Sequence, residues 1–393
     1  MENDFKPDTD EGVHDLIRWA SAESEPIEIV GHGSKRGIGK PTQTARTLDL
    51  SRLTGVTLFE PEELVLSAKA GTPLTELHHL LAEHNQEFQF EPADLGPLLG
   101  LEAGDGTLGG LVSTNFAGPR RLKSGSVRDH ILGLTAVSGR GEVFKTGGRV
   151  VKNVTGYDLA KGLTGAWGTL AVITDITMKV LPKAETEQTL VLTGLSGEDA
   201  TEAMALAMGS SAEVSAAAYL PDPLLDAPAA VLLRLEGVEP SVRSRLETLH
   251  TVLQAFGERE ELDADQSKSI WQDVRDVRYF VGRDTPVWRV SCTPTSGTAF
   301  AEAVANKADV HWYADWQGGL IWLECRDGEA HDTLIRRVLA AHGGGHATLV
   351  RAKSEIRRQL PVFQPLEPAL AALSERYRSN FDPRGILNPG RLS

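Results

Sequence analysis

Cysteine is scarce in this sequence, with only Cys292 and Cys325 among 393 residues. Two cysteines exclude a disulfide framework, and they cannot by themselves hold an iron–sulfur cluster. We expect both to be small apolar residues buried in strands.

Basic charge and long apolar runs are also lacking. Lys and Arg number 40 against 54 Asp and Glu, so the net charge is −14. This balance argues against binding to nucleic acid or to an anionic membrane surface. No apolar run approaches the roughly 20 residues that span a bilayer, and residues 1–10 lack the features of a signal peptide. We therefore expect a cytoplasmic protein that does not insert into a membrane and is held at one only through a partner.

Glycine, by contrast, is abundant, with 39 residues, and it is clustered between residues 102 and 182. The clusters read Gly104-Asp105-Gly106-Thr107-Leu108-Gly109-Gly110, Ser124-Gly125-Ser126-Val127-Arg128-Asp129, Lys152-Asn153-Val154-Thr155-Gly156-Tyr157-Asp158 and Gly165-Ala166-Trp167-Gly168-Thr169-Leu170. Because glycine has no Cβ, its backbone can come close to a large ligand. Tight turns without a ligand would explain one such cluster, but they explain four much less well.

One cluster, Gly104-x-Gly106-x-x-Gly109, matches the dinucleotide fingerprint of a Rossmann fold. That fingerprint needs an apolar strand before it and a helix that opens within it. Here Glu102 and Ala103 precede it, and the segment after it stops at a Gly-Pro pair. We therefore reject a Rossmann site.

A further glycine-rich loop spans residues 31–39. Successive N–H groups in such a loop form a concave nest that binds anions, and Ser34, Lys35 and Arg36 add a hydroxyl and positive charge. The loop is not a P-loop, because Gly39-Lys40 is followed by Pro41. Taken alone, it is either a phosphate site or an ordinary surface loop.

The pattern of apolar residues predicts two regions of different character. Up to Pro182 we expect strands over 27–30, 64–68 and 172–180, a hairpin over 131–145, and a helix that starts at Thr72 and Pro73. After Pro182, strands and amphipathic helices alternate, which indicates an antiparallel sheet covered on one face by helices. The strands are expected over 189–192, 229–235, 287–292 and 320–325, and the helices over 198–208, 241–256, 267–277, 332–342 and 369–378.

Residues 31–39, 104–118, 125–129 and 168–173 together resemble the FAD-binding domain of the vanillyl-alcohol oxidase, or PCMH-type, flavoprotein family. Within it, the runs Ser-Gly-Ser-Val-Arg-Asp, Val-Lys-Asn-Val-Thr-Gly-Tyr-Asp-Leu and Asp-Pro-Arg-Gly-Ile-Leu-Asn-Pro-Gly-Arg-Leu resemble the FAD-binding subunits of bacterial glycolate oxidase (glycolate dehydrogenase). The likeness covers about residues 26–183 and 342–392 and is weak in between. It implies an α+β fold with a PCMH-type FAD-binding domain over 1–185, a smaller antiparallel-sheet cap over 186–350, and a segment over 351–393 that returns to the FAD-binding domain.

The resemblance also implies a role for each motif residue. The loop of Gly31, His32, Gly33, Ser34 and Lys35 would hold the FAD diphosphate. The remaining cofactor contacts would come from Gly104, Thr107, Gly109, Gly110, Asn115, Gly118, Gly125, Val127, Arg128, Asp129, Gly168 and Ile173. Some relatives attach FAD covalently through a histidine near this loop; for His32 we expect an exposed loop histidine and non-covalent FAD.

Oxidation of a 2-hydroxy acid needs a cation for the carboxylate and a base near the hydroxyl. Arg289 and His346 are the candidates, because arginine binds carboxylates bidentately and histidine titrates near neutral pH. Arg289 also has a plainer interpretation, as a surface or interface cation on a strand. His342 and His346 have the i, i+4 spacing of metal ligands, but the glycines between them disfavour a helix, and we expect no metal site. The His-x-Gly-Asp-Gly-Asn-x-His signature of the catalytic hydroxy-acid flavoenzymes of this family is absent.

Three functions stay open at this point. The resemblance favours an FAD-binding subunit that oxidises glycolate to glyoxylate and passes electrons through flavin to a partner. Its partners would be a larger flavoprotein subunit and an iron–sulfur subunit. The alternatives are a stand-alone FAD-dependent 2-hydroxy-acid dehydrogenase, similar to a D-lactate dehydrogenase, and a non-catalytic flavin-binding assembly or electron-relay subunit.

Overall fold

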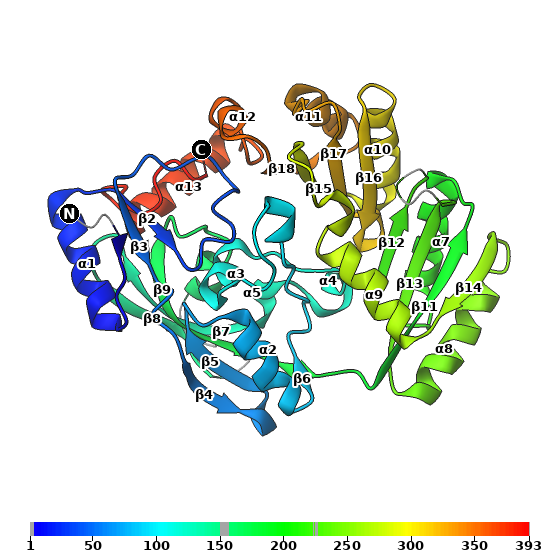
Figure 1. Cartoon of the computed structure of the whole chain (residues 1–393), viewed down its shortest axis with the longest axis horizontal. Helices are drawn as coiled ribbons and strands as arrows, with labels where there is room; N and C mark the ends of the chain where they lie inside the picture. The colour runs from blue at the N-terminus through cyan, green and yellow to red at the C-terminus, as the bar shows by residue number, and fades with distance from the viewer. Residues whose placement is uncertain (1–3, 150–156, 223, 225–226, 393) are drawn as a thin grey trace.

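The computed structural model describes residues 4–149, 157–222, 224 and 227–392, and it divides into two halves that lie side by side (Figure 1). In the third glycine cluster, residues 152–156 lie outside the described residues. Both chain ends lie on the first half, because the C-terminal segment returns there after the second half is complete (Figure 1).

The first half is built on two sheets. A parallel sheet of three strands has the order β1-β3-β2, and an antiparallel sheet of five has the order β4-β5-β9-β7-β8. The strands are β1 (Asp4–Phe5), β2 (Ile27–Val30), β3 (Arg46–Asp49), β4 (Val56–Glu60), β5 (Val65–Lys69), β7 (Ile131–Ser138), β8 (Val143–Gly147) and β9 (Ala171–Lys179). The short strands β6 (Gln86–Glu87) and β10 (Leu181–Pro182) pair separately.

Helices enclose the first core against these sheets. They are α1 (Asp10–Glu23), α2 (Leu74–Glu83), α3 (Leu108–Thr114), α4 (Arg121–Ser124), α5 (Val127–His130) and α6 (Leu159–Leu163). The expectation that Thr72 starts α2 is wrong. Pro73 is the residue before the helix, and the Thr72 hydroxyl instead accepts a hydrogen bond from Gly55 N at 3.0 Å.

The second half contains an eight-stranded antiparallel sheet with the order β14-β11-β13-β12-β16-β17-β15-β18. Its strands are β11 (Thr186–Thr193), β12 (Ala216–Leu220), β13 (Ala230–Gly237), β14 (Glu258–Leu262), β15 (Val287–Cys292), β16 (Val310–Asp315), β17 (Leu320–Cys325) and β18 (Gly345–Arg351). Cys325 is buried in β17 and Cys292 is half-buried at the end of β15, and both are free thiols.

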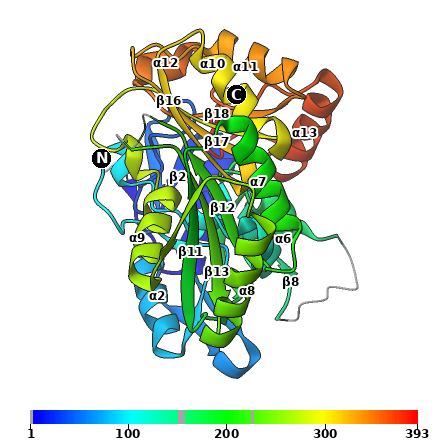
Figure 2. The ribbon, with the colours of Figure 1, turned by 90° about the vertical axis from the view of Figure 1, so that its right-hand side faces the viewer.

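The two faces of this sheet are covered differently. One face packs against α7 (Gly197–Gly209), α8 (Glu239–Val252), α10 (Gly297–Ala305) and α11 (Asp332–Ala341). The other packs against α9 (Ala264–Arg275) and against side chains of the first half, namely Ile38, Leu95, Leu98 and Phe116. Figure 2 views the molecule from the side of the second half. The two halves therefore share a continuous apolar core.

We propose a domain boundary between β10 and β11, because the first core ends near Val180 and the second begins at Leu190. We name the two parts the FAD-side domain and the cap domain. After β18, Val362 still packs in the cap core, whereas Ile386 and Leu387 pack in the first core. Helices α12 (Ser354–Gln359) and α13 (Pro368–Phe381) lie between these points.

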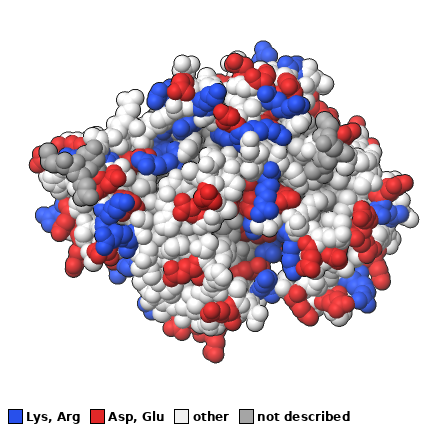
Figure 3. All heavy atoms as spheres, in the orientation of Figure 1, with Lys and Arg blue, Asp and Glu red and all other residues white. Residues whose placement is uncertain are grey.

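Charge on the surface is mixed. On the face shown in Figure 3, acidic and basic side chains are interspersed. Among the described residues, no helix is both long enough and apolar enough to cross a membrane.

Candidate functional site

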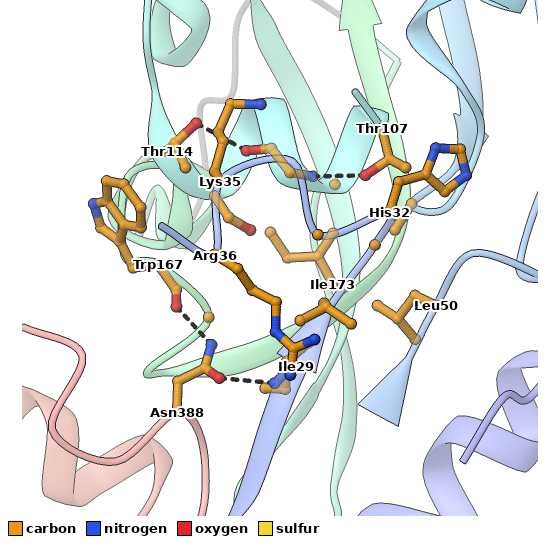
Figure 4. A pocket seen from close by; sticks show the side chains of 18 of the residues that line it. Ile29, His32, Lys35, Arg36, Leu50, Thr107, Thr114, Trp167, Ile173 and Asn388 are labelled. Carbon is orange, nitrogen blue, oxygen red and sulfur yellow. Dashed lines mark hydrogen bonds between the residues drawn. The ribbon is translucent and has the colours of Figure 1, made fainter. Parts of the chain in front are cut away.

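A pocket lies in the FAD-side domain, and its volume is about 760 Å³ when the open space at its mouth is included. Its wall is formed by the end of β2 and the loop after it, the start of α3, the first residues of β9, and the C-terminal segment (Figure 4). The lining residues are Ile29, Val30, Gly31, His32, Gly33, Ser34, Lys35, Arg36, Leu50, Ala70, Thr107, Gly109, Gly110, Ser113, Thr114, Trp167, Gly168, Ala171, Ile173, Asn388 and Arg391.

The loop after β2 presents backbone donors to the pocket. Within the described chain, the N–H groups of residues 32–35 donate no hydrogen bond, whereas Arg36 N and Ile38 N close the turns behind them. Gly33 has φ +80°, which lets the loop curl in a way that other residues rarely adopt. Free N–H groups in a curled glycine loop are an anion-binding arrangement.

Helix α3 approaches this loop closely because small residues separate them. Thr107 is the N-cap, and its Oγ1 accepts a hydrogen bond from Gly110 N at 3.2 Å. A Cβ on Gly31 would collide with the Thr107 side chain, and a Cβ on Gly109 would lie 2.9 Å from the Ala70 carbonyl oxygen. Helix α3 begins at Leu108, inside the Gly104–Gly109 fingerprint, so the prediction that no helix opens there is wrong. No strand directly precedes the fingerprint, and in this respect it differs from a Rossmann site as predicted.

The charged side chains of the pocket fall into two groups. Arg36 pairs with Glu28, which also accepts from Arg391 at 2.9 Å. The Lys35 side chain forms no hydrogen bond or ion pair with any residue in the described ranges. Burial lowers the pKa of Lys35, and the charges of Asp94 and Asp105 oppose that shift. One unpaired cation thus stands among the free N–H groups.

His32 lies at the side of the pocket next to Thr107 (Figure 4). Its Nδ1 is 3.0 Å from Asp105 Oδ1, so Asp105 is positioned to orient the imidazole ring.

The C-terminal segment closes the pocket opposite His32. Asn388 Oδ1 accepts from Ile29 N at 2.7 Å, and its Nδ2 donates to Trp167 O at 2.8 Å (Figure 4). Trp167 has φ +55°, an uncommon value for a large residue. Asn388 therefore holds together β2 and the loop before β9 around the cavity.

The predicted cofactor residues divide into two sets. Those that line the pocket are Gly31, His32, Gly33, Ser34, Lys35, Thr107, Gly109, Gly110, Gly168 and Ile173. Those that lie outside its lining are Gly104, Asn115, Gly118, Gly125, Val127, Arg128 and Asp129.

The second set has local structural contacts. Gly104 N donates to Asp94 at 2.7 Å, and Asn115 accepts from Arg128 N at 3.1 Å. Asp129 forms a capping box with Ser126 at the start of α5. Gly118 O accepts from the Trp316 indole across the domain boundary. These contacts support the pocket wall from behind.

Sequence reasoning did not assign several lining residues. They are Ile29, Val30, Arg36, Leu50, Ala70, Ser113, Thr114, Trp167, Ala171, Asn388 and Arg391. Asn388 and Arg391 belong to the Asn-Pro-Gly-Arg run near the C-terminus, which was part of the family resemblance. That run could therefore have pointed to them. The apolar lining residues carry no such signal, because apolar residues that line a pocket cannot be told apart in the sequence from apolar residues that pack in a core.

The two catalytic candidates lie outside the pocket lining, on the cap sheet. Val290 and Ala347 form a cross-strand pair whose side chains enter the core under the helices. Since side chains alternate along a strand, Arg289 and the exposed His346 point to the opposite face, towards the FAD-side domain. They are not directly paired, because Arg289 lies opposite Thr348 and His346 lies opposite Ser291.

Comparison with known proteins identifies the cofactor of this chain. Residues 3–147 match the family model described as FAD binding domain. The chain is 32% identical to glycolate oxidase subunit GlcE of Escherichia coli, over 98% of this chain and 97% of that protein. It is also 31% identical to D-lactate dehydrogenase of Archaeoglobus fulgidus, over 50% of this chain and 42% of that protein.

A solved structure of p-cresol methylhydroxylase with substrate bound shares the fold, with a TM-score of 0.75 and 15% identity. The match covers 99% of this chain and 88% of that chain. It confirms the α+β, PCMH-type fold expected from the sequence.

FAD is therefore the cofactor, and the residues present fit it. The free N–H groups of residues 32–35 and the unpaired Lys35 suit a diphosphate. Gly31 and Gly109 let the backbone lie closer to Thr107 and Ala70 than a residue with a Cβ could, which brings the loop and α3 together at the pocket.

Proposed function

Because this chain belongs to the family of FAD-binding glycolate oxidase subunits that includes GlcE, we propose that it is the FAD-binding subunit of a glycolate dehydrogenase complex. In this role it oxidises glycolate to glyoxylate and passes the electrons to a partner subunit. The observation that carries the proposal is the pocket with its free loop N–H groups and unpaired Lys35, in a chain similar to GlcE along almost its whole length.

Bound FAD would supply the electron acceptor, since it would take the carbon-bound hydrogen of the substrate together with both electrons, while the hydroxyl proton would go to the protein. The protein must then neutralise a carboxylate and accept a proton. We assign the carboxylate to Arg289, whose guanidinium stays charged at neutral pH. We assign the proton to His346, which is exposed and lies on the same face of the sheet.

We further propose that FAD is bound non-covalently: Asp105 lies at ion-pair distance, 3.0 Å, from His32 Nδ1, although no hydrogen bond joins the two groups. Denaturation in acid should release the yellow chromophore into solution. Colour that stays with the polypeptide would contradict this part of the proposal.

The partners that we propose are a larger flavoprotein subunit and an iron–sulfur subunit. With two cysteines, this chain cannot hold an iron–sulfur cluster alone. Pull-down of the native complex should therefore yield more flavin than this chain can hold, together with iron and acid-labile sulfide.

The direct test is anaerobic reduction of the FAD-loaded complex by glycolate, followed by loss of absorbance near the flavin band. Gly31→Ala should abolish both flavin content and reduction, because its Cβ would lie 3.0 Å from Thr107 Cγ2 and closer still to Oγ1. Gly209→Ala is the control, since a Cβ there meets nothing within 4 Å. A complex that keeps its flavin but is not reduced by glycolate would contradict the assigned substrate.

The likeness to a D-lactate dehydrogenase over half of the chain favours a second candidate, a stand-alone 2-hydroxy-acid dehydrogenase. That candidate predicts bleaching of the isolated chain by D-lactate or glycolate without any partner. The missing cap signature favours a third, a flavin-binding relay subunit, in which Gly31→Ala would disturb assembly before turnover.

A further inference from the structure

Two arginines from different domains converge on one tryptophan at the domain boundary. The Arg121 guanidinium carbon lies 4.4 Å from the ring centroid of Trp316, and that of Arg289 lies 5.0 Å from it. Arg289 also lies 5.4 Å from the Phe116 ring. Arg121 belongs to α4 of the FAD-side domain and Arg289 to β15 of the cap domain, and both elements face the boundary in Figure 1.

The Trp316 ring is held in one position. Its Nε1 donates to Gly118 O at 3.0 Å, and its backbone N donates to Asp315 Oδ1 at 2.7 Å. Trp316 is 4% exposed and has φ +53°, a backbone conformation that persists only when the surroundings enforce it. The indole therefore forms a rigid platform for the two guanidinium groups.

Neither cation is neutralised. In the ranges that the structure describes, the side chains of Arg121 and Arg289 form no ion pair and donate no hydrogen bond. Two arginines that are buried at this boundary are, by contrast, satisfied: Arg234 binds Glu91 through two bonds of 2.8 Å, and Arg351 donates to Glu324 at 2.9 Å and to main-chain oxygens.

The acids nearest to the two cations are already engaged. Asp129, near Arg121, accepts from Ser126 at 2.8 and 2.9 Å. Asp315, near Arg289, accepts from Trp316 N. Burial and then the charge of Arg121 lower the pKa of Arg289 to about 10, and the charge of Asp315 opposes this shift only in part.

This pair stands close to the cofactor pocket. The Phe116 ring lies 5.9 Å from that of Trp167, which lines the pocket. Phe116 also follows Ser113 and Thr114 of the pocket wall by a few residues. The rings of Phe116 and Trp167, in that order, lie between Arg289 and the cavity.

We propose that Arg121 and Arg289 together bind the carboxylate of a small 2-hydroxy acid above the indole of Trp316. The inference rests on the proposed function and adds Arg121, supplied by the opposite domain, as a second carboxylate ligand. Each guanidinium can donate two parallel hydrogen bonds to a carboxylate. Because the two come from different domains, the substrate site is complete only when the domains are docked as in this structure.

The test uses the FAD-loaded full chain and oxalate, a small dicarboxylate that cannot be oxidised as a hydroxy acid. Binding is measured by titration calorimetry for wild type, Arg121→Gln, Arg289→Gln and the control Arg243→Gln, an exposed arginine of α8 paired with Glu239. Loss of a charge-assisted hydrogen bond should weaken oxalate binding at least about tenfold in each site variant. The control should bind like wild type, and wild-type affinity should fall as salt rises.

Unchanged oxalate affinity in both site variants would overturn the inference. So would sulfate binding as tightly as oxalate with the same dependence on the two arginines, because the site would then be a general anion site. If Arg289→Gln fails to fold, Arg121→Gln decides alone, since Arg121 is an exposed residue. Failure of the proposed function would look different: wild type would bind oxalate through both arginines, yet glycolate would not reduce the flavin.

Discussion

At the scale of single residues, burial sets the chemistry of Asp315. This carboxylate is 2% exposed, and its only hydrogen bond in the described structure comes from Trp316 N. Burial raises the pKa of Asp315 to about 7, although the Trp316 N–H and the charges of Arg234 and Arg289 favour ionisation. Its neighbour Glu91 is also buried, but two arginines hold the pKa of Glu91 at about 2. The difference follows from direct ion pairing, which Glu91 has and Asp315 lacks.

Asp315 should therefore make stability depend on pH. Its pKa is raised in the folded state, so the folded protein binds a proton more tightly than the unfolded chain. Its contribution to stability is present below pH 3.8 and is lost as the pH rises to about 7. Asp315→Asn lacks the titrating carboxyl and therefore does not lose this stability. Between pH 4 and pH 8, its free energy of unfolding should rise by about 2–4 kcal/mol relative to that of wild type.

Urea unfolding at several pH values measures this difference. Asp265→Asn is a suitable control, because Asp265 is an exposed residue of α9. A gap between Asp315→Asn and wild type that stays constant with pH would show that the Asp315 carboxyl does not titrate in this range.

At the scale of elements, the C-terminal segment completes the pocket. It runs beside β2, where Ile27 N donates to Ile386 O at 2.8 Å and Asn388 N donates to Ile27 O at 3.0 Å. Arg391, which is 4% exposed, donates to Ile38 O at 2.7 Å behind the glycine-rich loop. The segment thus acts as an additional strand at the pocket rim.

Asn388→Ala should loosen the cofactor. It removes the bonds to Ile29 N and Trp167 O and leaves both groups without a protein partner, at a cost of about 1–3 kcal/mol. We expect FAD to dissociate about tenfold or more faster, as followed by the rise of free flavin fluorescence.

Asn380→Ala provides the matched control for this change. Asn380 is exposed on α13 and donates only to Arg376 O, within its own helix. Equal FAD release from both variants would mean that Asn388 does not hold the pocket closed.

The elements also show where sequence patterns succeed. The hairpin of β7 and β8 and the helices α7, α8, α9, α11 and α13 lie where alternation or helical periodicity predicts them. Strands β12, β14, β16 and β18 and helix α10 are not predicted. Strand β12 reads Ala-Ala-Ala-Tyr-Leu and is buried throughout, so it has no alternation to detect. Strand β14 reads Glu-Arg-Glu-Glu-Leu and pairs at an edge, where backbone hydrogen bonds rather than apolar residues define it.

At the scale of the whole molecule, a buried ionic cluster joins the two domains. Arg120 of the FAD-side domain contacts Glu236 on β13 of the cap, and Arg234 on β13 contacts Glu91 of the FAD-side domain. Arg120 also pairs with Glu87 and Glu91 of its own domain, and Arg234 lies 3.4 Å from Glu236 on the same strand, so the ion pairs run both within each domain and across the boundary. The cluster therefore fixes the relative placement of Arg121 and Arg289.

Arg234→Met should destabilise the protein strongly. Arg234 is 2% exposed, and its removal takes two hydrogen bonds of 2.8 Å from the buried Glu91, whose charge Arg120 at 3.6 Å then compensates only in part. Breaking a buried ion pair in this way costs about 3–5 kcal/mol. Trp271 lies 4.7 Å from the Arg234 guanidinium, so indole fluorescence together with circular dichroism can follow the transition.

Arg243→Met is the control for this experiment, since Arg243 pairs with Glu239 on the surface and such pairs contribute under about 1 kcal/mol. Equal destabilisation by the two substitutions would argue against a role for the buried cluster in docking the domains.

From the amino-acid sequence alone, the cofactor class and the glycine-rich side of its pocket could be predicted. Gly31, Gly33 and Gly109 are needed where the backbone must curl or approach closely, and that demand is local, so it is visible in the sequence. The residues that contact this side of the pocket from distant parts of the chain are known only from the tertiary structure. Asn388 reaches Ile29 across 359 residues of chain, and Arg121 reaches Trp316 across a domain boundary. Such contacts depend on how separate elements pack, and no local pattern of residues encodes that packing.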